Sequence, residues 1–160
     1  MTMYFSGPRN LDKAHDTDAG YDIYPDDLRH KDEIYWAPFE VKKVFTSLYV
    51  DIPEGHVGII KERSGFAARG IPLRIMGGVI DAGYKGEVIV LTQNCGPNVL
   101  SISTTRAIAQ LVVLPIYRGT TTKLTRKAFD EHAEFLAVIH HDAAVNNMRG
   151  SNGFGSSDEQ

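Results

Sequence analysis

Short runs of apolar residues with the two-residue period of β-strands limit the fold of this chain more than any other feature of its sequence. The runs cover residues 42–51, 56–61, 71–80, 87–94, 99–103 and 107–117. Turn-forming residues such as Gly, Pro and Asn separate them, and this combination predicts short strands. The composition agrees, because 15 glycines and 7 prolines suit many tight turns better than long helices. We therefore expect an all-β fold, either an antiparallel sandwich or a barrel.

Two segments depart from the strand pattern and favour helices. A short helix is expected after Ser64, and a longer one from about Ala128 to His140, where apolar residues form a loose stripe. Among the strands, Val88–Leu91 is apolar on both alternating faces. This pattern is typical of a strand that a second sheet or another subunit covers.

Length and composition favour one domain. The 160 residues lie within the usual size of a domain, and 42% hydrophobic with 23% charged residues is ordinary globular usage. We assign residues 1–148 to a β domain, in which an extended connection at 117–148 is partly helical. Residues 149–160 are rich in Gly and Ser and form a separate C-terminal segment.

Charge and cysteine content restrict the partners and the cellular compartment. A formal net charge of −3 lacks the basic excess of a nucleic-acid binder, so no direct nucleic-acid binding is expected. The single cysteine, Cys95, excludes an intrachain disulfide and is interpreted as a small buried hydrophobe. No apolar run approaches the roughly 18 residues of a membrane span, and the first residues do not resemble a signal peptide. We expect a soluble cytoplasmic protein without a membrane partner.

The segment Ile80–Gly86 places a carboxylate where an apolar strand ends. Asp81 would lie at the tip of a hairpin that turns through Ala82 and Gly83 and re-enters a strand at Glu87. Apolar surroundings partly desolvate a carboxylate, and this suits a general base that activates water. An aspartate in a turn also serves simply to cap the backbone, and the segment alone leaves both interpretations open.

Two further stretches have the residues of an anion site. In Arg63–Gly70, Ser64 is a suitable N-cap and Gly70 a suitable stop for a short helix. Its first N–H groups and the adjacent arginine would bind a phosphate, although an ordinary capped helix has the same pattern. In the C-terminal segment, Arg149 would neutralise a phosphate and Phe154 would stack on a planar ring, whereas a mobile tail is the simpler interpretation.

Taken in order, five segments of the chain resemble the five motifs of the trimeric deoxyuridine triphosphatases, or dUTPases. The segments are AHDTDAGYDI at 14–23, KERSGFA at 61–67, GGVIDAGYKG at 77–86, IAQL at 108–111 and RGSNGFGSS at 149–157. Their joint occurrence in this order is far more specific than any one of them. The resemblance extends from residue 14 to the C-terminal segment.

The resemblance implies a jelly-roll-like fold and a homotrimer in which each active site is built from three chains, with a C-terminal lid that closes over it. It also implies hydrolysis of dUTP to dUMP and pyrophosphate, with Mg²⁺ carried on the triphosphate. This reaction limits uracil in DNA and supplies dUMP for dTMP synthesis. On this basis Asp81 is the catalytic base, which orients and deprotonates the attacking water.

Other positions take their expected roles from the matched motifs. The residues implied to bind phosphate are Arg63, Ser64, Gly65, Gln110 and Arg149. Those implied to bind uracil and deoxyribose are Gly78, Val79, Ile80, Tyr84, Phe154 and Gly155. Tyr84 would exclude a 2′-hydroxyl, Phe154 would cover the uracil, and Asp22 would contact the metal through water.

The sequence departs from the family pattern at several positions. Gly83 stands where many members have a second acidic residue. Arg106 and Ala107 replace an acidic residue and an arginine before the Ile-Ala-Gln motif. Asn152 replaces a glycine of the fifth motif, and asparagine tolerates a positive φ better than most residues. The connection at 117–148 is longer than a minimal member needs.

Two alternatives remain beside the hydrolase. A related deoxycytidine triphosphate deaminase would use a catalytic glutamate, and Glu87 follows the third matched motif directly. A regulatory protein would use the nucleotide as a signal and bind a protein partner through the connection at 117–148.

Overall fold

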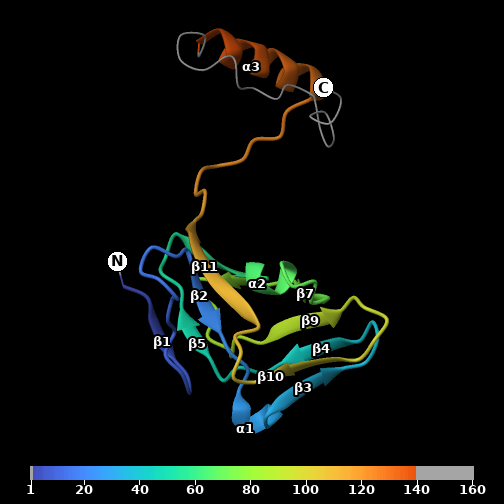
Figure 1. The fold of residues 1–160 in the computed structure, drawn as a ribbon. Helices are drawn as coiled ribbons and strands as arrows, with labels where there is room; N and C mark the ends of the chain where they lie inside the picture. The colour runs from blue at the N-terminus through green and yellow to red at the C-terminus, as the bar shows by residue number, and fades with distance from the viewer. Residues whose placement is uncertain (1, 140–160) are drawn as a thin grey trace. The chain divides into compact units, whose positions relative to one another are not determined.

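The structure is a computed structural model that describes residues 2–139 (Figure 1). The chain divides into two compact units, of which the first ends at Arg118 and the second begins at Gly119. The strands of the first unit are β1 (Tyr4–Ser6), β2 (Gly20–Ile23), β3 (Glu33–Trp36), β4 (Val41–Val44), β5 (Tyr49–Asp51), β6 (His56–Lys61), β7 (Leu73–Met76), β8 (Val79–Asp81), β9 (Val90–Asn94), β10 (Leu100–Ser103) and β11 (Ala109–Pro115). Its helices are α1 (Asp27–His30) and α2 (Ser64–Ala67). The expected all-β fold is confirmed.

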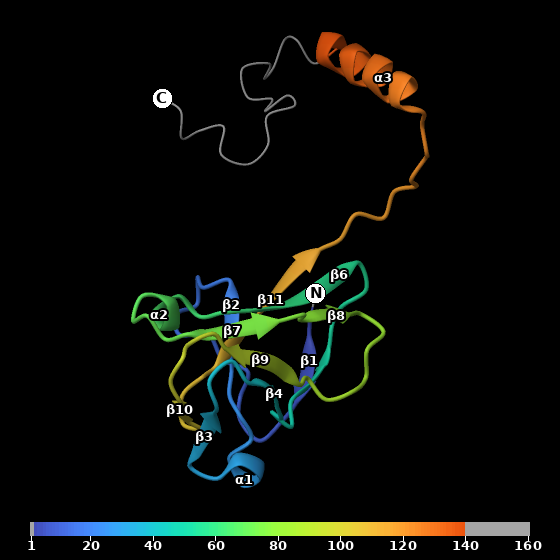
Figure 2. The same cartoon turned by 90° about the vertical axis from the view of Figure 1, so that its right-hand side faces the viewer.

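The strands of the first unit form four antiparallel sheets. One has the order β2-β11-β6-β8, a second has the order β4-β9-β7, and β1 pairs with β5 and β10 with β3. Neighbouring strands are mostly far apart along the chain, so the chain crosses repeatedly between sheets, as in a jelly roll. In Figure 2, β6 and β11 lie above β9 and β4, and the core lies between these two layers.

The core consists mainly of aliphatic side chains from all four sheets, together with the aromatic rings of Trp36 and Phe66. Trp36 is fully buried, and its Nε1 donates to Oγ1 of Thr92 at 2.9 Å. The same hydroxyl donates to the carbonyl of Lys42 at 2.8 Å. A buried donor without an acceptor would cost about 1–3 kcal/mol. The hydrogen bond to Thr92 therefore allows Trp36, the largest side chain of the core, to be buried without an unsatisfied polar atom.

The strand predicted at residues 42–51 is two strands, β4 and β5, in different sheets. The chain turns at Ser47, whose φ of 51° lies in the left-handed region. The N–H groups of Thr46 and Ser47 both donate to the carboxylate of Glu87, at 3.0 and 2.7 Å. Because this acceptor is 40 residues from Ser47 in the sequence, the local pattern does not reveal the break.

The strand predicted at residues 71–80 also divides. Gly77 and Gly78 have φ values of 66° and 97°, and they separate β7, which pairs with β9, from β8, which pairs with β6. A Cβ at Gly78 would lie 2.9 Å from the Cβ of Ile60. Glycine is therefore required at position 78 both by the backbone conformation and by the close approach of β6.

The prediction of a hairpin around Asp81 is wrong. Strand β8 ends at Asp81, and the chain then crosses to the other sheet, where β9 begins at Val90. Along this crossing Val88 and Val90 are buried, whereas Ile89 is 38% exposed. Ile89 therefore lies on a face that was predicted to pack against a second sheet or another subunit but is exposed in the single chain.

Cys95 is exposed, so the prediction of a buried residue is wrong. Buried positions alternate along β9, and the last of them is Asn94. The amide of Asn94 donates to the carbonyls of Ala37 and Asn98 at 3.0 and 2.8 Å. Cys95 follows this buried amide and therefore points outward.

The second unit contains α3 (Arg126–Ile139), which confirms the helix predicted from about Ala128. The predicted end, His140, lies outside the described residues. The N–H of Ala128 donates to the Thr125 hydroxyl at 3.2 Å, at the start of the helix. The boundary predicted at residue 148 also lies outside the described part and stays a prediction. Within residues 2–139, none of the helices combines the length and apolar character that crossing a membrane requires.

Candidate active site

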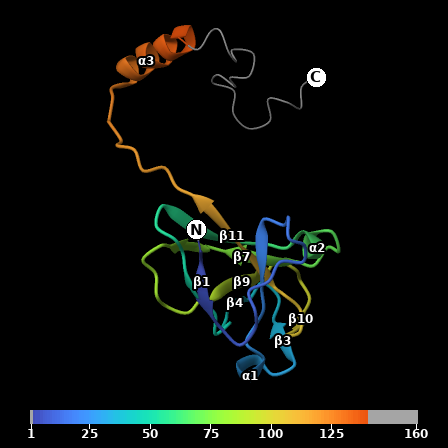
Figure 3. The same cartoon turned by 90° about the vertical axis from the view of Figure 1, so that its left-hand side faces the viewer.

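A pocket of about 690 Å³ opens beside α2. Its walls come from β2 and the loop before it, from α2, and from the turn that leads into β11. Figure 3 shows α2 next to β2, although more than 40 residues separate them in the sequence. The pocket brings together five residues predicted to bind phosphate or metal, namely Asp22, Arg63, Ser64, Gly65 and Gln110.

Helix α2 is a single turn that follows β6. Ser64 is its first residue, and the cap is Arg63, whose side chain makes no capping hydrogen bond, so the prediction of Ser64 as the N-cap is wrong. The buried Phe66 fastens the turn to the core. Gly70 has a φ of 65° just beyond the helix, as the predicted stop requires. The exposed Ser64 and Gly65 are thus held at the mouth of the pocket.

Arg63 is oriented by two acceptors. Its Nη2 lies 3.0 Å from Oδ2 of Asp22, and its Nη1 donates to the carbonyl of Ala107 at 3.2 Å. These contacts use one donor from each terminal nitrogen, and a guanidinium carries five N–H groups. Arg63 therefore retains donors for an anion in the pocket.

Gln110 faces the same pocket from β11. Its residue lies opposite Asp22 of β2 and Lys61 of β6, and its Nε2 donates to the carbonyl of Glu62 at 2.9 Å. Gly20 leaves room for this side chain, because a Cβ at Gly20 would lie 2.3 Å from Oε1 of Gln110. A substitution at Gly20 would therefore displace the amide from the pocket.

The Asp22 carboxylate suits a magnesium ion whose other contacts come mainly from a bound phosphate ligand. Its Oδ2 pairs with Arg63, and no partner of its Oδ1 is found among the described residues. Those residues also contain no cluster of three or more His, Cys, Asp or Glu side chains suited to a metal. Mg²⁺ commonly keeps several waters and binds through one or two carboxylates together with phosphates. One free carboxylate oxygen at the pocket matches that mode.

The remaining predicted residues of the described chain lie elsewhere. Strand β8, which contains Val79, Ile80 and Asp81, is the edge strand of the sheet opposite to β2. Asp81 pairs with Val57, at the far end of β6 from the residue that pairs with Gln110. The Asp81 side chain is exposed, so the expected desolvation is not present within the single chain.

Tyr84 is held by the loop that it belongs to. Its hydroxyl donates to the carbonyl of Glu87 at 2.8 Å. A Cβ at Gly86 would lie 2.5 Å from that hydroxyl, so the ring packs directly over a glycine. Tyr84 is 42% exposed in the single chain.

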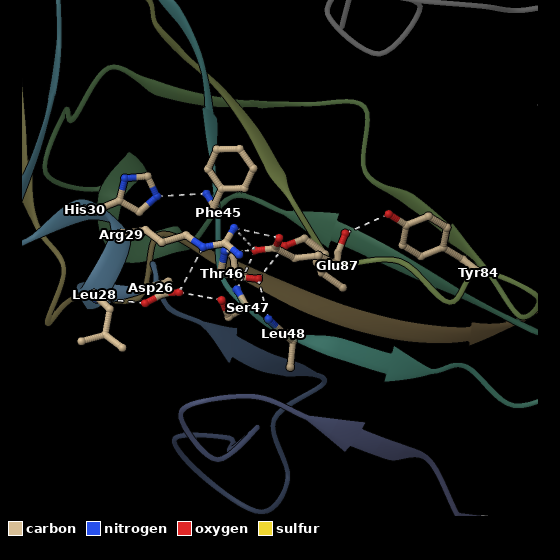
Figure 4. A network of polar contacts seen from close by, with 11 residues as sticks. Asp26, Leu28, Arg29, His30, Phe45, Thr46, Ser47, Leu48, Tyr84 and Glu87 are labelled. Atoms are coloured by element: carbon tan, nitrogen blue, oxygen red, sulfur yellow. Dashed lines mark hydrogen bonds and ion pairs between the residues drawn. The ribbon is translucent and has the colours of Figure 1, made fainter.

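The loop with Tyr84 is anchored to the body of the unit by the Glu87 network, which consists of Asp26, Arg29, Thr46, Ser47 and Glu87 (Figure 4). The Glu87 carboxylate accepts from the Thr46 and Ser47 N–H groups and from Nη1 of Arg29, at 3.0 Å from Oε2. Because these three donors occupy the Glu87 carboxylate, its contacts are those of a structural residue. They disfavour the alternative in which Glu87 is the catalytic glutamate of a deaminase.

Asp26, the N-cap residue of α1, completes the Glu87 network. Its Oδ2 accepts from the Ser47 hydroxyl at 2.5 Å, and its Oδ1 accepts from the N–H of Leu28 at 2.9 Å. The hydrogen bond from Ser47 lowers the pKa of Asp26, although burial opposes the shift. The side chain is nearly buried and stays ionised because its acceptors are satisfied.

Two arginines that line the pocket had no predicted role, and three residues with predicted roles lie outside the described part of the chain. Arg69 and Arg106 also line the pocket, and only Arg106 stood out beforehand, as a departure from the family pattern. Arg149, Phe154 and Gly155 lie outside the described residues, so their predicted roles stay predictions. The role of Glu87 had no local signal, because its partners are distant in the sequence.

Fold and pocket together define an antiparallel β protein with an arginine-lined site for an anionic ligand. The model of the dUTPase family matches residues 9–136. The deoxyuridine 5′-triphosphate nucleotidohydrolase of Tropheryma whipplei (strain Twist) is 35% identical over 159 residues, which cover 98% of this chain and 94% of that protein. The corresponding protein of Gloeobacter violaceus is 39% identical over 104 residues, which cover 64% of this chain and 69% of its own. The chain therefore belongs to the dUTPase family.

Solved structures agree with this assignment. The dUTPase from phage phi11 of S. aureus superposes with a TM-score of 0.69 at 26% identity, covering 79% of this chain and 97% of its own. The dUTPase of Staphylococcus bacteriophage 80alpha, solved with dUpNHpp, gives a TM-score of 0.68 at 27% identity, covering 78% and 89%. The jelly-roll-like fold expected from the motifs is thus confirmed.

Proposed function

We propose that this protein hydrolyses dUTP to dUMP and pyrophosphate. The observation that carries the proposal is the pocket in which Arg63, Ser64, Gly65 and Gln110 come together, as predicted for phosphate binding. Family membership and the names of the relatives support the same activity. Such a reaction would limit uracil in DNA and supply dUMP for dTMP synthesis.

The active site is shared between chains in a homotrimer. Asp81 and Tyr84 belong to β8 and the loop after it, whereas the phosphate pocket lies beside β2, at the other edge of the same sheet. One chain therefore supplies the phosphate site without the proposed base. Pairing the pocket of one chain with β8 of a neighbour resolves this separation, and Arg149, Phe154 and Gly155 would close the site as a lid.

Asp81 is the proposed general base. Its exposed carboxylate takes a proton from a water molecule, and the water oxygen forms a bond to the α-phosphorus. The bond between the α-phosphorus and the bridging oxygen breaks, and pyrophosphate leaves with that oxygen. The proton remains on Asp81 until dUMP is released, so atoms and charge balance.

Donors in the pocket stabilise the charge that develops on the leaving pyrophosphate. Arg63 contributes its remaining guanidinium donors, and Ser64 and Gly65 contribute backbone N–H groups at the start of α2. Magnesium bound to the triphosphate would lower the negative charge of the leaving group. Oδ1 of Asp22 would accept from its water shell. A solved mutant of the phage phi11 dUTPase is described as coordinating a structural Mg(II) ion.

Strand β8 and Tyr84 supply the proposed selectivity. In the described part of the chain β8 pairs on one side only, with β6, so its other edge offers N–H and C=O groups to uracil. A fixed pattern of donors and acceptors rejects cytosine, whose edge is reversed. The ring of Tyr84, held by its hydroxyl, would leave no room for the 2′-hydroxyl of UTP.

The direct test is pyrophosphate release from dUTP, dCTP, dTTP and UTP, each with Mg²⁺ and with a chelator. We expect rapid, metal-dependent release from dUTP alone. Release of ammonia from dCTP would instead support the deaminase. No release by a folded protein that binds dUTP would support a regulatory nucleotide-binding protein.

Replacing the proposed base tests the mechanism. Asp81→Asn should keep affinity for dUpNHpp and lower kcat by at least about 10²–10⁴-fold, the usual contribution of a positioned base. Asp32→Asn is the matched control, since Asp32 is an exposed aspartate that does not line the pocket. Full turnover by Asp81→Asn would remove Asp81 from the chemistry.

A further inference from the structure

Arg106 lines the phosphate pocket, yet no predicted role falls on it. It lies in the turn between β10 and β11, and its own N–H closes this turn by donating to the carbonyl of Ser103 at 3.1 Å. Its guanidinium lies over the ring of Phe66, 5.1 Å from the ring centroid. A guanidinium stacked on an aromatic face keeps its edge donors free for a ligand.

Both supports of Arg106 belong to the packed fold. Phe66 is 3% exposed, and the turn is fastened through the buried Thr104. The Thr104 hydroxyl donates to the carbonyl of Lys31, and its N–H donates to the carbonyl of Asp32, both at 2.9 Å. A side chain that is already supported loses less conformational entropy when a ligand binds.

The charges of the pocket leave Arg106 without a counterion. Three arginines and two aspartates line the pocket. Asp22 pairs with Arg63, and Asp18 accepts the N–H of His15 at 3.0 Å. Among the side chains of residues 2–132, which the structure describes, no carboxylate pairs with Arg106. Such an excess of fixed donors recognises a polyanion.

We propose that Arg106 binds the pyrophosphate part of the nucleotide, an inference that rests on the proposed hydrolysis of dUTP. Because Asp81 lies at the other edge of the sheet, the reacting α-phosphate must face a neighbouring chain, and the β- and γ-phosphates extend into the arginine pocket. Arg106 is adjacent to Ala107, whose carbonyl orients Arg63.

The test compares ligands with and without the pyrophosphate part. Calorimetry with Arg106→Ala and Arg106→Gln should show binding of inorganic pyrophosphate and of dUpNHpp weakened about tenfold, the effect of losing one charge-assisted contact. Binding of dUMP should change less than twofold. Arg106→Gln keeps part of the aliphatic stem and removes only the guanidinium that lies over Phe66, so it remains informative if Arg106→Ala folds poorly. Arg74→Ala, an exposed arginine of β7 outside the pocket, is the matched control.

The outcomes separate this inference from the proposed function. If the wild type hydrolyses dUTP while both variants bind pyrophosphate as tightly as the wild type, the role of Arg106 is wrong and the proposed function stands. If dUMP binding falls as much as pyrophosphate binding, Arg106 is structural and the inference is also wrong. If the wild type neither binds nor hydrolyses dUTP, both proposals fail.

Discussion

The Glu87 network and the proposed phosphate pocket both contain acidic and basic side chains, but the two regions differ in how far these charges are paired. In the network, the carboxylates of Glu87 and Asp26 accept from surrounding donors and are 12% and 7% exposed. In the pocket, Arg63 shares its donors with Asp22, and Arg106 has no carboxylate partner in the described part of the chain. Charged side chains that hydrogen-bond to neighbouring groups stabilise a fold, whereas arginines that retain free N–H donors in a pocket indicate a binding site for a ligand.

This difference separates stability from function. The network joins the loop with Tyr84 to α1 and to the turn at Ser47, so its loss should first destabilise the fold. The pocket lies at the surface of the unit, so loss of its cations should first weaken binding. Variants in each region test this difference.

The largest effect should follow from removing the acceptor at the centre of the network. Glu87→Ala leaves the N–H groups of Thr46 and Ser47 without their acceptor, and each unsatisfied group costs about 1–3 kcal/mol. We expect the free energy of unfolding in urea to fall by about 3 kcal/mol. Glu33→Ala, which removes a glutamate that bonds only exposed side chains, should cost far less. Equal stability of the two variants would contradict the comparison.

A somewhat smaller effect, now on activity, should follow in the pocket. Arg63→Ala removes a charged donor of the phosphate site, and we expect kcat/KM for dUTP to fall about 100-fold, equivalent to about 2.7 kcal/mol. The free energy of unfolding should change by less than about 1 kcal/mol, because the Arg63–Asp22 pair is partly exposed. A variant that loses stability but retains kcat/KM would place Arg63 with the structural charges instead.

The smallest effect should come from lowering the pH, and it should act on the stability of the fold. Because the pKa of Asp26 is lower in the folded state, its ionised form stabilises the fold above the ordinary range of aspartate, near pH 4. This stabilisation is lost as the pH falls through the lowered pKa. Asp26→Asn should be less stable at pH 7 and should lose less stability than the wild type between about pH 5 and pH 2. Parallel profiles in thermal unfolding would exclude this role.

Local sequence patterns predicted those elements that have a recognisable apolar pattern of their own. The bounds of β6 were predicted exactly, and α3 was found from its apolar stripe. The break at Ser47 was missed because a non-glycine residue with a positive φ depends there on Glu87, which is distant in the sequence. The hairpin at Asp81 was wrong for a related reason, since strand pairing depends on the whole sheet.

The sequence predicted some residues of the candidate site but not how they are arranged. Matched motifs identified Arg63 and Gln110, and the structure places both at one pocket. They could not reveal that Asp81 lies apart from that pocket in the single chain, because this separation follows from the strand order. Arg106 was noticed only as a departure, and its stacking on Phe66 follows from tertiary packing alone.

Strand β8 also bears on how newly made chains behave. An edge strand with free backbone groups is a template on which a strand of another molecule can add, which leads to aggregation. Here the edge has three residues, two left-handed glycines precede it, and the charged Asp81 ends it. An added strand would gain few hydrogen bonds before meeting a bend or a charge. The geometry proposed to admit a nucleobase thus also hinders edge-to-edge growth into fibres.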